Sequence, residues 1–200
     1  MNSRPARHGT ARSAKADGAT SSLGDLMDIE MKAEHAITSA VHGKIHAVLD
    51  ECFPGYPARS YFKQLPQFRY LGWSRGELVA HLGVEHRMVN NGGAVLQIFG
   101  VVDLCVVASA RSQGHARRLL DELEELARRS EIDAVLLFAD DPRLYLAAGY
   151  RRVPGPVKWV MLHEHETIGI AERPVDELMV KMLNEKPWNP DTVDLLGYLF

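Results

Sequence analysis

Residues 101–129 constrain the fold more than any other stretch, because they indicate a buried strand, a tight turn and a long amphipathic helix in succession. Residues 101–107 are mostly apolar and β-branched, as in a buried strand. After Gly114, apolar residues recur every three or four positions, and the intervening positions form oppositely charged pairs four residues apart. The sequence therefore predicts a strand that leads directly into a helix with one buried face.

The turn between that strand and helix, residues 111–116, suits the binding of an anion. Small residues such as Ser112 and Gly114 let backbone N–H groups approach a ligand closely, and the free N–H groups at a helix start attract negative charge. The turn lacks the Gly-Lys-Ser/Thr of a P-loop and the three glycines of a dinucleotide-binding fingerprint. A diphosphate is the predicted ligand, with an ordinary strand-to-helix turn as the alternative.

The composition and charge of the 200-residue chain narrow the class of protein. An apolar fraction of 46% is ordinary for a globular core, and a net charge of −3 argues against nucleic-acid binding. No run approaches the ~18 apolar residues of a membrane-spanning helix, so no membrane partner is expected. The two cysteines, Cys52 and Cys105, lack the spacing of a metal or redox site and are predicted to be reduced thiols in a cytoplasmic protein.

Residues 1–24 are rich in Arg, Ala, Ser and Gly and contain no apolar segment of a secretory signal. We expect a disordered N-terminal tail there, followed by one domain over residues 25–200. No metal site is expected, because the pairs His42/His46 and His163/His165 each lack a third ligand.

Turn residues and apolar periodicity predict the remaining elements. The other expected helices cover residues 38–52, 60–65 and 143–148. The expected strands cover residues 28–33, 68–73, 78–89, 94–107, 134–138 and 150–153, with weaker candidates at 157–162, 167–170 and 177–183. The continuous apolar run 134–138 indicates a parallel strand, whereas 68–107 indicates antiparallel pairing. Gly100 suggests a bulge or a close backbone approach, and the apolar C-terminal residues are expected to pack.

A second motif lies at residues 144–150, Leu-Tyr-Leu-Ala-Ala-Gly-Tyr. It resembles the Leu-Tyr-x-x-x-Gly-Phe/Tyr segment of the GNAT superfamily of N-acetyltransferases, and residues 111–116 resemble that superfamily's Arg/Gln-x-x-Gly-x-Gly/Ala loop. Both motifs occur in the expected order on the expected elements, so the resemblance covers about residues 28–153. It implies an α/β (α+β) fold, in which a central mixed, mostly antiparallel twisted sheet is flanked by helices on both faces.

The resemblance also implies a function. GNAT enzymes transfer the acetyl group of acetyl-CoA to an amine by direct attack, without a metal, and we expect the primary amine of a small molecule here. Tyr145 would protonate the departing thiolate. The residues implied to bind acetyl-CoA are Val106, Val107, Arg111, Ser112, Gln113, Gly114, His115 and Ala116. His115 stands where the family usually has an aliphatic residue.

Three residues are candidates for the base that deprotonates the amine. Asp103 ranks first, because an acid inside an apolar run is hard to explain without a role. Glu85 ranks second and His81 third, and their equal parity on one strand places them on the same side. By resemblance, Tyr56 and neighbouring aromatic residues would wall the acceptor pocket; plain core aromatics are the alternative.

Among GNAT enzymes, the pattern most resembles the aminoglycoside 2′-N-acetyltransferase branch. In that branch an acidic, aromatic-rimmed cleft holds a polycationic sugar, and Trp188, Asp191 and Asp194 are its loose counterparts here, at a longer spacing. The branch also carries an acid where this chain has Val102. A non-catalytic acyl-CoA-binding or protein-interaction module with the same fold is the alternative function. The sequence leaves open whether the chain forms a homodimer.

Overall fold

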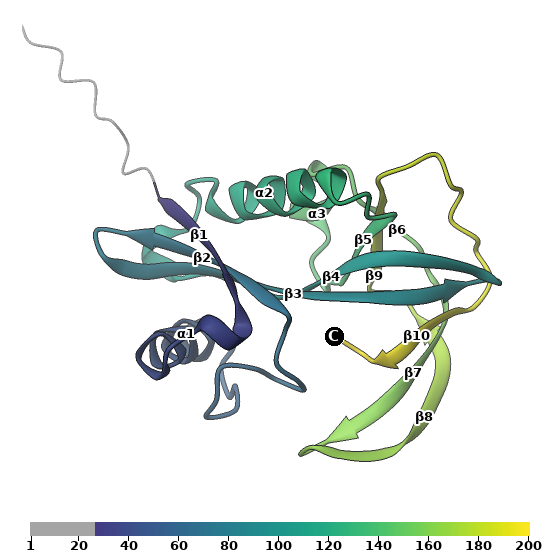
Figure 1. The fold of residues 1–200 in the computed structure, drawn as a ribbon, viewed down its shortest axis with the longest axis horizontal. Helices are drawn as coiled ribbons and strands as arrows, with labels where there is room; N and C mark the ends of the chain where they lie inside the picture. The colour runs from purple at the N-terminus through teal and green to yellow at the C-terminus, as the bar shows by residue number, and fades with distance from the viewer. Residues whose placement is uncertain (1–26) are drawn as a thin grey trace, which may run out of the picture.

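A computed structural model describes residues 27–200 (Figure 1). The tail expected over residues 1–24 lies outside the described residues. The helices are α1 (Ser39–Cys52), α2 (His115–Arg129) and α3 (Arg143–Ala147), with short 3-10 turns η1 (Glu34–Ala36) and η2 (Ala108–Ala110). The strands are β1 (Asp28–Ala33), β2 (Phe68–Ser74), β3 (Glu77–Asn91), β4 (Ala94–Val106), β5 (Ala134–Phe138), β6 (Arg151–Arg152), β7 (Gly155–His163), β8 (Glu166–Val175), β9 (Leu178–Met182) and β10 (Val193–Tyr198).

The strands form one curled sheet in the order β6-β9-β5-β4-β3-β10-β7-β8, and β2 and β1 extend it from the other half of β3. Among the described strands, β4–β5 and β10–β7 pair in parallel and the other pairs are antiparallel. The first half of β3 pairs with β2, and its last two residues pair with β10. The predicted mixed, mostly antiparallel sheet is thus confirmed.

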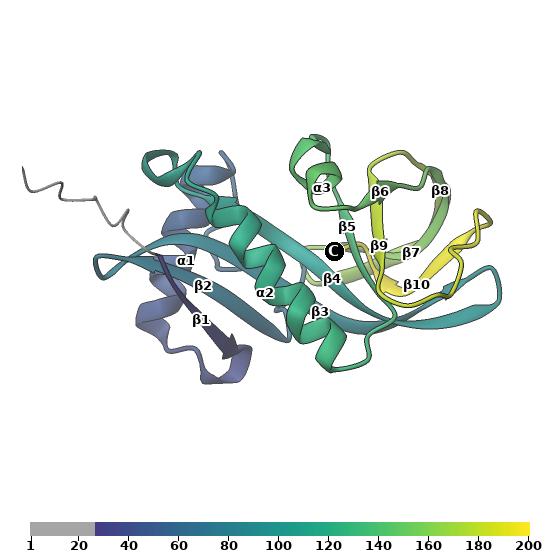
Figure 2. The ribbon, with the colours of Figure 1, turned by 90° about the horizontal axis from the view of Figure 1, so that it is seen from above.

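Helices cover both faces of this sheet, as expected. On one face, Leu119, Leu120 and Leu123 of α2 pack among buried side chains of β2, β3 and β4. Figure 2 shows α2 lying diagonally across these strands, and α3 lies on the same side beside β5. On the opposite face, Ile45 and Leu49 of α1 pack in a second cluster of buried residues (Figure 1). A third buried cluster fills the curl between β4, β5, β7, β9 and β10.

The helix expected over residues 60–65 is wrong, because that segment forms bends. Its carbonyl groups accept hydrogen bonds from arginine side chains instead of from helical amides. Arg69 donates to the Ser60 carbonyl, and Arg59 donates to those of Tyr61 and Phe62. Tertiary contacts thus override the local helical pattern.

The C-terminal residues pack as expected, and they do so as strand β10, which the sequence did not predict. β10 lies between β3 and β7, and its pairing with β7 is irregular between Asp194 and Tyr198. The weak strand candidates are all present, and the one at 167–170 extends over the whole of β8.

Gly100 marks a close approach and not a bulge. Its pairing with Glu85 on β3 and Leu136 on β5 is regular. A Cβ at this position would lie 2.7 Å from the Phe200 ring, so only glycine lets that ring lie against the strand.

Candidate functional site

The site begins where two parallel strands separate. Residues 98–100 of β4 pair with residues 134–136 of β5. Beyond this point the two strands are no longer paired, although β4 continues to Val106 and β5 to Phe138. The diverging ends leave an opening at the middle of the sheet. Two cavities of about 730 and 610 Å³ lie along it.

A β-bulge shapes the β4 side of this opening. On β3, His81 pairs with Cys105 and Gly83 pairs with Val102, so Leu82 alone opposes the two residues Asp103 and Leu104. Asp103 adopts a left-handed backbone conformation, with φ of 50°. A bulge re-aims side chains at the point where it interrupts the ladder, and here it turns the Asp103 carboxylate into the larger cavity.

The smaller cavity, which we call the α2 groove, lies at the start of α2. Gly114 precedes the helix in the left-handed conformation, with φ of 80°, and no side chain caps the first N–H groups of α2. Open space lies above Gly114, because a Cβ there would meet no atom within 4 Å. Arg111 and Arg117 belong to the lining, and Arg117 is paired with Asp121 at 2.7 Å. Uncapped amides, open space and two arginines fit a diphosphate.

Most of the residues predicted to bind acetyl-CoA line the α2 groove: Val106, Arg111, Ser112, Gly114, His115 and Ala116. Val107 and Gln113 do not line it, and the Val107 N–H donates to the Val79 carbonyl within the sheet. His115 is buried, and its Nδ1 has no hydrogen-bond partner among the described residues. Burial lowers the pKa of His115, so the ring is neutral at physiological pH.

The larger cavity, which we call the acceptor cavity, adjoins the α2 groove. Both cavities are lined by Phe53, Leu104 and Asp141, so the end of α1, the bulge and the β5–α3 loop mark their junction. The segment after α1 forms one side of the acceptor cavity, and the β7–β8 hairpin forms the other. Figure 1 shows these two parts on the same side of the sheet, with the C-terminus between them.

Asp103 reaches the acceptor cavity with one partner bound. The Tyr56 hydroxyl donates to Asp103 Oδ2 over 2.5 Å, a contact between residues far apart in the sequence. Burial raises the pKa of Asp103, and the hydrogen bond from Tyr56 opposes this rise. Burial also raises the pKa of Tyr56, so its hydroxyl stays a donor. A half-buried carboxylate with a raised pKa is well suited to accept a proton.

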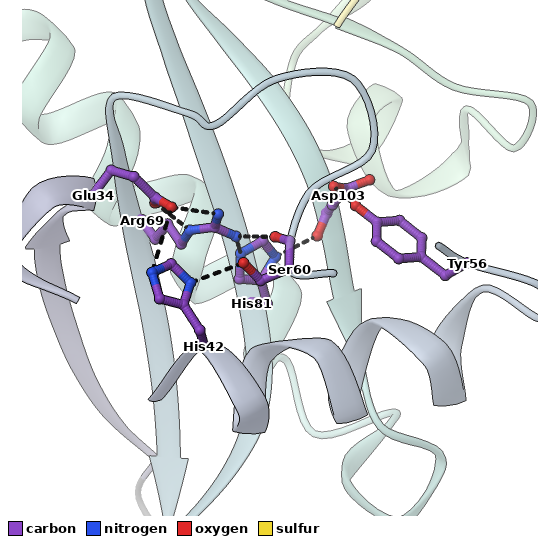
Figure 3. Close-up of polar contacts among 7 residues, drawn as sticks. All are labelled: Glu34, His42, Tyr56, Ser60, Arg69, His81 and Asp103. Carbon is purple, nitrogen blue, oxygen red and sulfur yellow. Dashed lines mark hydrogen bonds and ion pairs between the residues drawn. The ribbon is translucent and has the colours of Figure 1, made fainter. Parts of the chain in front are cut away.

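A buried polar network holds the backbone of Asp103 from behind (Figure 3). Arg69 is only 1% exposed, donates twice to the Glu34 carboxylate at 2.6 and 3.0 Å, and donates to His81 Nε2 at 3.0 Å. Since arginine can only donate, His81 must carry its proton on Nδ1, from which it donates to the Asp103 carbonyl at 2.8 Å. His42 and Ser60 complete the network at 2.8 Å from each other.

His81 therefore lies behind the site and not in the acceptor cavity. It is 1% exposed, and both ring nitrogens are engaged by Arg69 and Asp103. Burial and the charge of Arg69 lower the pKa of His81 to about 3, which keeps the ring neutral. This geometry fits a residue that positions the bulge. The sequence also missed Arg69, although a charge inside the apolar strand 68–73 is the same signal that singled out Asp103.

Glu85, the second candidate base, also lines the acceptor cavity, but both of its carboxylate oxygens are engaged. The Tyr198 hydroxyl donates to Oε1 at 2.6 Å, and Arg87 donates to Oε2 at 2.8 Å. In Asp103, by contrast, only Oδ2 is engaged, by Tyr56, so one oxygen has no hydrogen-bond partner among the described residues. The geometry favours Asp103 over Glu85.

Tyr145 lines the acceptor cavity from α3. Its ring packs edge-on against Tyr150, with 6.0 Å between ring centroids. Burial raises the pKa of Tyr145 to about 12, so the hydroxyl is protonated at physiological pH.

The predicted aminoglycoside contacts lie elsewhere. Asp191 is exposed, Asp194 forms an ion pair with Lys158 at 2.9 Å, and neither residue lines a cavity described above. Trp188 is partly buried against the cluster inside the curl. Tyr56 acts through Asp103 and is not itself a lining residue.

The two cysteines meet at the α2 groove, which their spacing in the sequence did not reveal. Cys52 ends α1, Cys105 lies on β4, and both line the groove as free thiols. Hydrogen bonds from Cys105 and Arg111 lower the pKa of Cys52 to about 7, against the effect of burial. The same contact with Cys52, together with burial, raises the pKa of Cys105.

Residues 27–200 lack two features that would point to other classes of protein. No helix in this part of the chain combines the length and the apolar character needed to span a membrane. Nor do three or more His, Cys, Asp or Glu side chains gather there as a metal site would need.

Comparison with solved structures identifies the fold. The chain is similar to a GNAT family N-acetyltransferase, YhbS, from Escherichia coli in complex with CoA, with a TM-score of 0.57, 17% identity, and coverage of 84% of this chain and 89% of that one. A GNAT family acetyltransferase from Brucella melitensis in complex with acetyl-CoA gives a TM-score of 0.54 and 12% identity over 81% of this chain and 92% of that one. A GCN5-related N-acetyltransferase from Kribbella flavida gives a TM-score of 0.52 and 16% identity over 64% of this chain. The matched part spans only 34% of that longer protein.

Comparison with models of protein families identifies the family of this chain. None of the curated proteins matches the chain. The family model described as an acetyltransferase (GNAT) domain matches residues 35–153, which include α1, the bulge, the α2 groove and α3. That match covers more than half of the sequence and agrees with the fold, and this chain therefore belongs to the GNAT acetyltransferase family.

Proposed function

We propose that this protein is an acetyl-CoA-dependent N-acetyltransferase that acts on the primary amine of a small molecule. One observation carries the proposal: the bulge points the Asp103 carboxylate into a cavity that joins the uncapped start of α2 at Leu104. A donor bound in the α2 groove and an amine beside Asp103 would meet at that junction.

The α2 groove would hold the diphosphate of acetyl-CoA. The N–H groups of His115 and Ala116 and the side chains of Arg111 and Arg117 supply its positive charge. When bound, acetyl-CoA supplies the thioester that the amine attacks. At the bulge, Asp103 and Leu104 have no register partner on β3, so backbone N–H groups there are placed to polarise a carbonyl.

Asp103 and Tyr145 would handle the protons. Asp103, which lines the cavity, takes the proton that the attacking amine must lose, while Tyr56 holds its Oδ2 and leaves Oδ1 without a hydrogen-bond partner among the described residues. Tyr145 holds a proton at the same cavity, because its raised pKa of about 12 keeps it protonated, and it would return that proton to the leaving thiolate.

Two finer alternatives receive less support. The resemblance to the aminoglycoside 2′-N-acetyltransferase branch finds no counterpart in the acceptor cavity, because Asp191 and Asp194 lie outside it. A non-catalytic acyl-CoA-binding module would not need a half-buried carboxylate and a protonated tyrosine in the cavity beside the donor groove.

The proposal is tested by amide formation from acetyl-CoA and a panel of small primary amines, followed by mass spectrometry and by thiol release. Asp103→Asn should lower kcat/KM by ~10²–10⁴, as expected for loss of a general base. In the wild type, kcat/KM should fall as the pH drops through the raised pKa of Asp103, because the protonated carboxyl cannot accept a proton.

Tyr56→Phe tests the direction in which the pH profile of kcat/KM should move. Loss of the hydrogen bond that lowers the Asp103 pKa should move the acid limb of the kcat/KM profile to higher pH. Tyr61→Phe is the matched control, because its hydroxyl contacts His165 outside the cavity and should leave the profile unchanged. An unshifted limb in Tyr56→Phe, or wild-type activity in Asp103→Asn, would overturn the assignment of Asp103.

A further inference from the structure

The acceptor cavity has a lining that is mostly apolar and aromatic. Phenylalanine and tryptophan rings reach it from four parts of the chain: Phe53 and Phe62 after α1, Phe138 at the end of β5, Trp159 on β7, and Phe200 at the C-terminal residues. Phe138 and Phe200 pack edge-on with 5.5 Å between centroids. Such a wall stabilises a bound aromatic or branched aliphatic body through the apolar surface that it buries.

Large apolar side chains also remain exposed at this cavity. Phe62 is 47% exposed, Phe53 37% and Ile168 60%, and all three belong to the lining. These residues come from the segment around α1 and from β8, two parts of the chain that the Lys63–Leu162 hydrogen bond joins beside the cavity. A ligand with its own apolar surface would cover them, whereas a fully polar ligand would leave them in water.

The charges in the cavity do not suit a polycation. Glu85 is paired with Arg87, and Asp141 with Arg143 at 2.6 Å. Two cations, Lys63 and Arg173, belong to the lining itself. Lys63 donates to the Leu162 carbonyl at 3.0 Å, and Arg173 lies 5.3 Å from the Trp159 ring centroid.

Among the described residues that line the cavity, only two carboxylates have no basic partner. These are Asp103, which is half-buried next to the junction with the donor groove, and Asp140, which is exposed. The carboxylate at the junction matches one ammonium group, and the exposed Asp140, which water screens, contributes little to holding a second. A second or third ammonium group would face Lys63 and Arg173.

We propose that the acceptor is an amphipathic monoamine, with one primary amine on an aromatic or branched aliphatic body and no further cationic group. The inference rests on the proposed function, because it assigns the acceptor to the cavity beside Asp103. The amine lies at the bulge, and the apolar body lies against Phe62, Trp159 and Phe200.

Direct binding tests this inference independently of turnover. Calorimetry on the full chain saturated with CoA would compare phenethylamine, ethylamine and the aminoglycoside kanamycin. Phenethylamine should bind about 10- to 100-fold more tightly than ethylamine, as burial of a phenyl ring predicts, and more tightly than kanamycin. The inference would be overturned if kanamycin bound as tightly as phenethylamine. It would also be overturned if phenethylamine and ethylamine bound equally tightly, or if neither of these two monoamines bound.

A pair of variants localises the effect. Phe62→Ala should remove most of the preference for phenethylamine over ethylamine, and its exposed ring makes loss of the fold a small concern. Met88→Ala also removes an exposed apolar side chain, 57% exposed, but lies outside both cavities and should preserve the preference. An equal preference in Phe62→Ala and Met88→Ala would contradict the assigned cavity.

Turnover separates this inference from the proposed function. Acetylation of phenethylamine in preference to kanamycin would support both. The expected binding order with no amide formed from any amine would overturn the proposed N-acetyltransferase, and the cavity would then be a binding site for an amphipathic monoamine that is not an acetyl acceptor. Acetylation of kanamycin in preference to phenethylamine would support the transferase and overturn the inference.

Discussion

At the scale of residues, the sequence pointed to Asp103 as a candidate base but did not reveal the side chains that position it. Asp103 stands out because a carboxyl inside an apolar run is costly without a role. Its partner Tyr56 lies 47 positions away, so no local pattern could predict their hydrogen bond. His81 was predicted to meet the substrate, but it lies behind Asp103, because the bulge and the buried Arg69 decide which way each side chain points.

The Tyr145 hydroxyl can be tested by removing it alone. Tyr145→Phe keeps the ring contact with Tyr150 and removes only the hydroxyl. If the hydroxyl returns the proton to the thiolate, kcat should fall by ~10²–10⁴ while the affinity for acetyl-CoA stays the same. Steady-state kinetics and calorimetry would measure the two quantities.

The control for Tyr145 is Tyr70→Phe, in which the lost hydroxyl bonds the Glu122 carbonyl away from both cavities. Wild-type kcat in Tyr145→Phe, with chemistry shown to be rate-limiting, would mean that the tyrosine only fills the core.

At the scale of elements, regular patterns were predictable and context-dependent segments were not. The apolar period of α2 and the continuous apolar run of β5 decide their conformations locally, and both occur as predicted. The segment at 60–65 and strand β10 depend on remote partners. In the first, Arg69 of β2 engages the Ser60 carbonyl and Lys63 reaches the Leu162 carbonyl of β7; in the second, β3 and β7 pair with the two edges of β10.

The start of α2 can be tested as the donor site by adding a negative charge there. Gly114→Glu places a carboxylate against the expected diphosphate, so acetyl-CoA affinity should fall by at least ~100-fold by calorimetry. Gly93→Glu is a matched control at the β3–β4 turn. Both glycines have left-handed φ, 80° and 92°, with no atom within 4 Å of a Cβ.

Both glycine variants should lose a similar ~1–2 kcal/mol of stability from the left-handed backbone. Only Gly114→Glu should lose affinity. Near-native affinity in that variant, or an equal loss in Gly93→Glu, would remove the α2 groove as the donor site.

At the scale of the whole molecule, the separation of β4 from β5 and the curl of the sheet create the two adjoining cavities. Residues 35–153 carry the family match, and β7, β8 and the C-terminal residues beyond it complete the acceptor cavity. The sequence predicted the first part through its motifs. It could not predict the second, because insertion of β10 between β3 and β7 brings distant residues such as Glu85 and Tyr198 together.

Donor and acceptor are expected to occupy the adjoining cavities at the same time, and a bisubstrate analogue would probe both cavities in one measurement. The probe is CoA whose sulfur is joined through an acetyl bridge to the nitrogen of an amine that the protein acetylates. Calorimetry should show that it binds ~10²–10⁴-fold more tightly than CoA, because joining the two ligands makes the second binding event intramolecular. An affinity no higher than that of CoA alone would contradict the account.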